Sequence, residues 1–76
     1  MNDESGSRQE QATMTSLEIV EMLRELDGAR VTELADALDL SPSTVHTHLS
    51  TLIETNYVVK SGDIYHLSLH FLGLAN

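Results

Sequence analysis

The sequence predicts a mainly α fold with a small β-wing, the three-helix winged helix-turn-helix. Three observations support this prediction. Apolar residues recur at helical spacing in three segments. The second and third of these segments are joined by a turn of only about three residues, as the helix-turn-helix motif requires. A two-strand pattern of alternating residues then follows at once.

The first helix is expected to begin between residues 12 and 16 and to end at Leu26, before the helix stop Asp27–Gly28. Thr15–Glu18 fits a capping box at its start. Residues 1–12 are polar and lack periodicity, so a disordered tail is expected there. The core stripe of this helix is expected to be Ile19, Val20, Leu23 and Leu26.

The motif itself follows. Thr32 is expected to cap the second helix, and Asp39 to adopt the left-handed backbone of the sharp turn. Ser41 and Pro42 supply a hydroxyl cap and a ring at the first position of the third helix, about residues 42–55, where a missing N–H costs nothing. The apolar stripes are Leu34, Ala35 and Leu38 on the second helix, and Val45, Leu49 and Leu52 on the third.

A β-hairpin over residues 57–67 is expected to form the wing. Its strands are Tyr57–Lys60 and Ile64–Leu67, and Ala29–Val31 is expected to add a short third strand. Alternation points Val58, Tyr65 and Leu67 inward. The domain is therefore expected to span residues 13–68.

The outer face of the third helix is rich in hydroxyls and almost uncharged, whereas solvated helix faces usually carry Glu and Lys. This face carries Ser43, Thr47, Ser50 and Glu54. The pattern favours recognition of duplex DNA over an ordinary helical bundle, although a fold alone does not imply a function.

Two groups of residues are candidates for contact with DNA. Those expected to face the major groove are Ser43, Thr44, His46 and Thr47. Those expected to lie near the sugar–phosphate backbone are Ser41, Thr51 and Lys60. Hydroxyls bond either phosphates or base edges, so these residues predict no particular operator.

The stretch from Ser16 to about Gly73 resembles the N-terminal DNA-binding domain of IclR-type transcriptional regulators. SLEIVEMLREL is similar to that family's first helix, VTELADALDLSPSTVHTHLSTL to its helix-turn-helix, and NYVVKSGDIYHLSLHFLGL to its wing and the start of its linker helix. The resemblance implies a transcriptional regulator that binds double-stranded DNA. It also implies a linker helix starting in residues 69–76 and a larger C-terminal effector-binding domain, which is absent from this chain.

Three positions depart from the family pattern. The family commonly has a basic residue where Pro42 stands, an arginine where Thr47 stands and a glycine where Asp39 stands. If the basic groups bind phosphates, this chain lacks two such contacts. The departures therefore concern affinity for DNA rather than the fold.

The resemblance also implies a two-fold homodimer, which joins first helices and linker helices and places two recognition helices about one duplex turn apart. Apolar residues that lie off the first core stripe or in the C-terminal segment are the candidate interface: Met14, Leu17, Phe71 and Leu72. An alternative is that the C-terminal ones cover the domain's own core. The alternative function is an acidic winged-helix module that binds another protein through these residues.

The formal charge of −8 is unusual for a DNA binder, because neutralised phosphates supply most non-specific affinity. Ten of the twelve acidic residues lie between Asp3 and Asp39, and only Glu54 lies between Leu40 and Gly62. Negative charge is thus concentrated away from the candidate DNA face. The acidic surplus is also typical of proteins adapted to a salt-rich cytoplasm, so a halophilic protein is expected.

Several classes are disfavoured by composition. Cysteine is absent, so disulfides and thiolate metal sites are excluded. No apolar run approaches the roughly eighteen residues of a transmembrane helix, and no signal peptide is present, so a cytoplasmic protein is expected. The candidate hydroxyls have no placed base, and no Gly-rich phosphate loop follows a strand, so an enzyme is not expected.

The histidines do not form a recognisable metal site. His46 and His48 would point roughly 200° apart on a helix, and His66 and His70 straddle the end of a strand. No metal and no cofactor are expected. His48 is expected to be partly covered, and His46 to flank the polar face.

Overall fold

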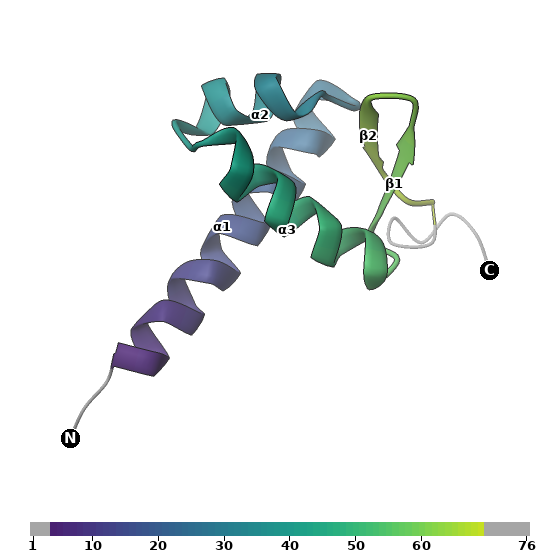
Figure 1. Cartoon of the computed structure of the whole chain (residues 1–76). Coiled ribbons are helices and arrows are strands. Elements are labelled where there is room, and N and C mark those ends of the chain that lie inside the picture. Colours follow the sequence, from purple (N-terminus) through teal and green to yellow (C-terminus); the bar gives the residue numbers. More distant parts are fainter. Residues whose placement is uncertain (1–3, 70–76) are drawn as a thin grey trace.

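The computed structural model describes residues 4–69, with side chains from residue 11 onward. Three helices precede one antiparallel hairpin, which is the winged helix-turn-helix that the sequence predicts (Figure 1). Its elements are α1 (Glu4–Leu26), α2 (Val31–Leu38), α3 (Pro42–Glu54), β1 (Val58–Ser61) and β2 (Ile64–Leu67). Nearly all of the expected linker segment, including His70, Phe71 and Leu72, lies outside the described residues.

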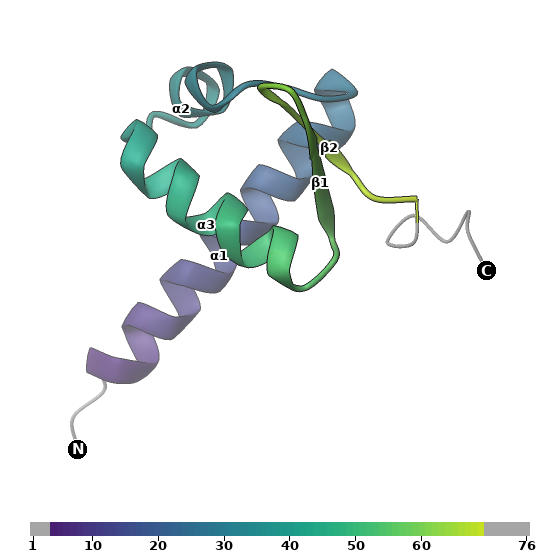
Figure 2. The same cartoon turned by 45° about the vertical axis from the view of Figure 1, so that its right-hand side comes forward.

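Helix α1 begins earlier than predicted. It starts at Glu4, so Thr15–Glu18 lies within the helix and cannot be its capping box, and most of the expected tail is helical. The residues upstream of Ala12 include Glu, Gln and Arg, which favour helix, and no proline interrupts them. Figures 1 and 2 show that the N-terminal half of α1 projects beyond the rest of the domain.

Apolar side chains from all five elements meet in one core. The predicted stripes of α2 and α3 are confirmed, although Leu38 is only partly buried. Leu26 was wrongly placed in the α1 stripe: it is 46% exposed, because it lies in the last turn and no described element covers it. The core consists of Ile19, Leu23, Ala29, Leu34, Ala35, Val45, Leu49, Leu52, Val58 and Tyr65.

Left-handed residues mark the predicted turns. Asp27 (φ 56°) and Gly28 (φ 106°) end α1, and a Cβ on Gly28 would lie 2.6 Å from ring atoms of His66. Glycine is therefore required there for both conformation and space. Asp39 (φ 57°, ψ 47°) ends α2, with its N–H donating to the carbonyl oxygen of Ala35, as expected for the turn of the motif.

The cap of α3 is as predicted, whereas that of α2 is not. Ser41 Oγ accepts a hydrogen bond from the backbone N–H of Thr44 (3.2 Å), and Pro42 occupies the first helical position. Helix α2 begins before Thr32, because Arg30 is its N-cap residue and donates its backbone N–H to Glu33 Oε1 (2.8 Å). The Glu33 carboxylate therefore caps the start of α2, in place of the predicted hydroxyl of Thr32.

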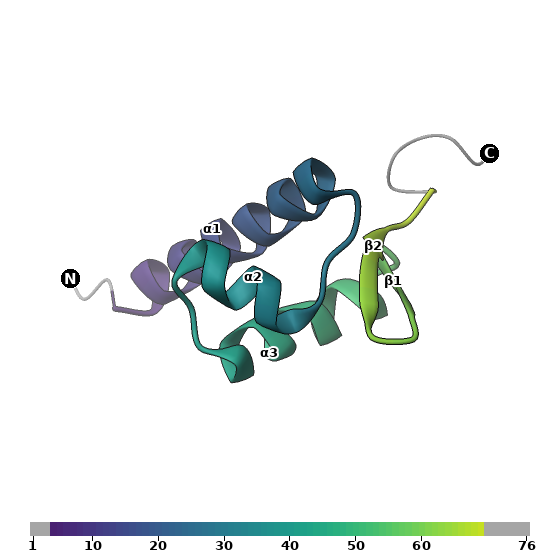
Figure 3. The same cartoon turned by 90° about the horizontal axis from the view of Figure 1, so that it is seen from above.

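The wing lies beside the ends of the helices, as the view from above shows (Figure 3). Its strands pair from Val58↔Leu67 to Ser61↔Ile64, which leaves a two-residue turn with Gly62 at φ 64°. The expected third strand is reduced to Ala29, whose N–H and carbonyl bond Tyr65 at 3.0 and 2.8 Å. The strand cannot continue because the next residue already caps α2.

Candidate nucleic-acid interface

Helix α3 packs on the core by one face and leaves the other open. Val45 and Leu49 are fully buried, and Leu52 is 6% exposed. The exposed residues along the opposite side are Ser43, His46, Thr47, Ser50, Thr51 and Glu54. The sequence predicted this division, and Glu54 at the C-terminal end is the one carboxylate of the helix. The first three turns of α3 therefore present a neutral surface.

Threonine hydroxyls on this surface bond back to the helix. Thr47 Oγ1 donates to the carbonyl oxygen of Ser43 (3.0 Å), Thr51 Oγ1 to that of Thr47 (3.4 Å), and Thr55 Oγ1 to that of Thr51 (3.1 Å). Each hydroxyl proton is thereby engaged, while its oxygen retains a lone pair. In this arrangement the Thr47 hydroxyl is an acceptor toward an external partner.

The N-terminus of α3 carries a small network of hydroxyls. Ser41 Oγ lies 2.8 Å from Thr44 Oγ1 and 3.3 Å from Ser43 Oγ. Thr44 is half-buried, whereas Ser43 is exposed. Of the two candidates at this end of the helix, Ser43 is thus the more accessible to a ligand.

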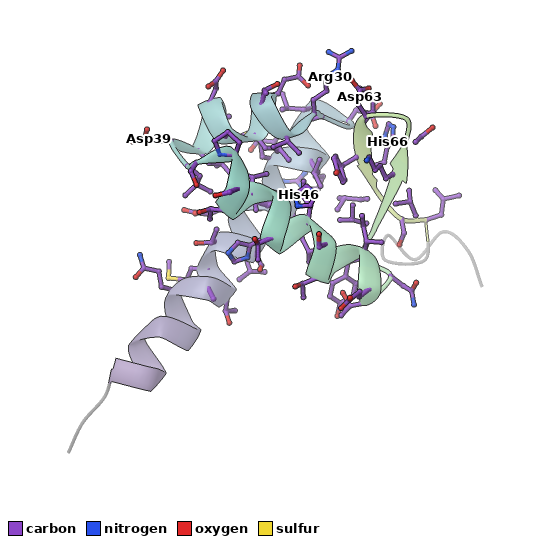
Figure 4. The ribbon with its side chains drawn as sticks, viewed as in Figure 1. Arg30, Asp39, His46, Asp63 and His66 are labelled. Atoms are coloured by element: carbon purple, nitrogen blue, oxygen red, sulfur yellow. The ribbon has the colours of Figure 1, made fainter. Side chains whose placement is uncertain are left out.

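The two histidines of α3 have different surroundings. His46 is exposed beside the polar face (Figure 4). His48 is half-buried, as predicted, and its Nδ1 lies 2.9 Å from Ser16 Oγ, so this contact ties α3 to α1. Among the side chains that the structure describes, no three His, Cys, Asp or Glu residues lie close enough to hold a metal ion.

Arg30 was not among the predicted site residues, although it belongs to the segment expected to pair with the wing. Its Nε lies 2.9 Å from Asp63 Oδ2 at the turn of the hairpin (Figure 4). Nearby, Lys60 Nζ stands 5.5 Å from the centre of the Tyr65 ring. These residues line a shallow hollow of about 260 Å³ together with Val31 and Thr32.

A second hollow of about 330 Å³ lies on α1. Met14 and Leu17, which are 62% and 59% exposed, line it with Met22 and Leu38. Its remaining lining residues are acidic: Glu18, Glu21 and Glu25. The two candidate interface residues on α1 are therefore accessible, on an apolar surface with a negatively charged rim.

Arg24 and Glu21 form an ion pair on α1 at 2.6 Å, with both side chains exposed. The hydrogen bond and charge of Glu21 raise the pKa of the Arg24 guanidinium.

Within residues 4–69, no helix combines the length and apolar character needed to cross a bilayer.

Three helices followed by an antiparallel hairpin, with one face of α3 exposed, define a winged helix-turn-helix domain. Residues 14–62 match the family of the IclR helix-turn-helix domain, and the chain belongs to that family. It is accordingly an IclR-type DNA-binding domain of the kind found in transcriptional regulators, and not an enzyme.

Two curated relatives are described as transcriptional regulators. A probable HTH-type transcriptional regulator of Halobacterium salinarum, ArcR, is 32% identical over 81 residues, covering 100% of this chain and 31% of the relative. An uncharacterised HTH-type transcriptional regulator of Methanocaldococcus jannaschii is 49% identical over 49 residues, covering 63% of this chain and 12% of the relative. The chain thus spans a third or less of the length of each relative.

One similar solved structure is the Zα domain of PKZ from Carassius auratus, in complex with Z-DNA. It has a TM-score of 0.72 and 27% sequence identity, and the match covers 75% of this chain and 97% of that domain. This likeness agrees with the winged-helix architecture described above.

Proposed function

We propose that the chain binds duplex DNA sequence-specifically, with α3 in the major groove and the wing near the backbone. The main support is the exposed, carboxylate-free face formed by Ser43, His46 and Thr47 over the buried stripe of α3. An α-helix fits the major groove, where each base pair presents a distinct pattern of donors and acceptors. The family supports DNA as the ligand, and the similar Zα domain also binds DNA, although in the Z form.

The hydrogen bonds of α3 indicate what it would recognise. Because the Thr47 hydroxyl donates to its own helix, its free lone pair suits the amino group of adenine or cytosine. His46 would contact a base edge or a phosphate. Ser41, Thr51 and Lys60 would contact the backbone, and Thr44 would have to give up its bond to Ser41 to reach a base.

The affinity of this chain for DNA should depend on salt concentration less steeply than that of a basic DNA-binding domain. For each tenfold rise in salt concentration, the apparent association constant falls about tenfold per phosphate that a cation neutralises. This chain has only four Lys and Arg residues. Hydroxyl and backbone contacts would then supply more of the affinity than in a basic domain.

Selection from a random duplex library, followed by fluorescence anisotropy over a KCl series, tests the proposal. The selected B-form duplex should bind on the order of a thousandfold more tightly than a scrambled one. Equal affinity for all duplexes would contradict sequence-specific recognition. Preference for a Z-form CG duplex would contradict insertion of α3 into the B-form major groove.

We also propose that two copies associate through Met14 and Leu17 on α1. Their exposure and the apolar hollow around them support this contact. The acidic rim opposes it at low salt, since like charges would face each other. At about 1 M salt the screening length falls to about 3 Å, so association should strengthen.

Sedimentation velocity from about 0.1 M to about 1 M KCl should show a dimer fraction that grows with salt. Leu17→Ser should abolish the dimer, whereas Leu26→Ser, at another exposed leucine of α1 outside the hollow, should not. A monomer at every salt and protein concentration would contradict the dimer. It would favour the alternative, in which the same hollow binds another protein.

We also propose, from the acidic surplus of the chain, that the protein is adapted to high salt concentrations. Every acidic side chain that the structure describes is exposed, so their mutual repulsion destabilises the fold when screening is weak. The free energy of unfolding, followed by circular dichroism in that KCl series, should rise with salt. Stability that is indifferent to KCl would count against the adaptation.

A further inference from the structure

We propose that Arg30, Thr32 and Lys60 form a seat for one phosphate of the DNA backbone, between the start of α2 and the wing. In the free protein, the Arg30 guanidinium forms an ion pair with the carboxylate of Asp63 instead of with that phosphate. DNA would displace the carboxylate on binding. The inference deepens the proposed duplex binding and rests on it.

Backbone hydrogen bonds hold the two sides of this seat together. Ala29 is bonded in both directions to Tyr65 of β2, and the next residue, Arg30, is bonded through its N–H to Glu33 of α2. The register pairs Tyr65 with Lys60 across the hairpin. The positions of Arg30 and Lys60 are therefore coupled through a short, hydrogen-bonded stretch of chain.

The seat gathers scarce positive charge. Arg30 and Lys60 are two of the four Lys and Arg residues in the sequence, and both line the same hollow of about 260 Å³. The exposed Thr32 adds a hydroxyl at its edge. A guanidinium, an ammonium and a hydroxyl can together donate to several oxygens of a single phosphate.

The Arg30–Asp63 ion pair is suited to exchange. Its side chains are 54% and 74% exposed, and exposed pairs of this kind contribute little to stability. The bond uses Nε, which leaves the other guanidinium N–H groups for an incoming oxygen. Once displaced, the Asp63 carboxylate would repel the phosphate, so this residue should weaken DNA binding.

The first test compares Arg30→Gln with Arg24→Gln in the full chain, using a duplex that the wild type binds. Arg24 is a matched control, because it also forms an exposed ion pair and its loss changes the net charge equally. Arg30→Gln should lower affinity about tenfold and reduce the salt slope by about one, as for loss of a phosphate contact. Arg24→Gln should leave the slope unchanged.

The second test removes the carboxylate. Asp63→Asn should raise affinity several-fold, whereas Glu21→Gln, the control on α1, should change it less. The gain from Asp63→Asn should shrink when Arg30→Gln is also present, since the guanidinium is then no longer there to be released. Arg30→Lys, which keeps the charge, should retain the salt slope, and circular dichroism checks that each variant is folded.

The outcomes separate the two proposals. Equal changes of affinity and slope in Arg30→Gln and Arg24→Gln would show that only net charge matters and would overturn the phosphate seat, while duplex binding stands. Lower affinity in Asp63→Asn would also overturn the seat. A wild-type chain that binds no duplex at any KCl concentration would overturn both proposals.

Discussion

Leu49→Ala is expected to destabilise the fold severely at moderate salt. Leu49 is fully buried in the middle of α3, which packs against α1, α2 and β1. Replacing a buried leucine with alanine costs about 2–5 kcal/mol through lost burial and the cavity left behind. A domain of this size has a free energy of unfolding of only about 4–11 kcal/mol, so this loss is large. Urea denaturation followed by circular dichroism at fixed KCl measures it.

Leu26→Ala is the matched control for that substitution. The side chains are identical, but Leu26 is 46% exposed, so its loss should cost less than about 1 kcal/mol. Helical periodicity assigned both residues to the core, whereas burial in the structure distinguishes them. Equal destabilisation by the two substitutions would show that α1 continues to pack on the core up to its last turn, contrary to the structure.

Thr47→Glu should have the largest effect on DNA binding. The substitution places a carboxylate at the middle of the exposed face of α3, which would face bases and flanking phosphates. Like charges brought together at an interface cost several kcal/mol, so affinity for any duplex should fall about a hundredfold. Anisotropy with the selected duplex and with a scrambled one measures the loss for specific and non-specific binding.

Thr13→Glu serves as the control, because it makes the same chemical change at an exposed position of α1. Thr13 belongs to the N-terminal half of α1, which projects beyond the rest of the domain (Figures 1 and 2). The control should reduce affinity only slightly, and less as KCl screens the added charge. Unchanged affinity in Thr47→Glu would contradict the assignment of this helix face to DNA. Equal losses in both variants would indicate an effect of net charge alone.

The proposed site was only partly predictable from the sequence. The exposed face of α3 follows from periodicity, because Ser43, Thr47 and Ser50 fall on the side of the helix opposite the buried stripe. The role proposed for Arg30 was not predictable in this way. It depends on an ion pair with Asp63, which is 33 positions away in the sequence.

Signals within a few residues of each other let the sequence by itself determine the helix-turn-helix and the hairpin. Asp39 adopts the expected left-handed turn, Ser41 and Pro42 start α3 as expected, and Gly62 lies in the turn of the wing. Caps and tight turns are local hydrogen-bonding and steric effects, so they can be read from a few adjacent residues.

Only the tertiary structure decided which member of a periodic stripe is covered and which distant groups meet. It exposed Leu26, placed Ser16 on α1 against His48 on α3, and brought Arg30 to Asp63 at the turn of the wing. Burial and such contacts depend on how whole elements pack in space, and one-dimensional periodicity carries no information about where a neighbouring element ends.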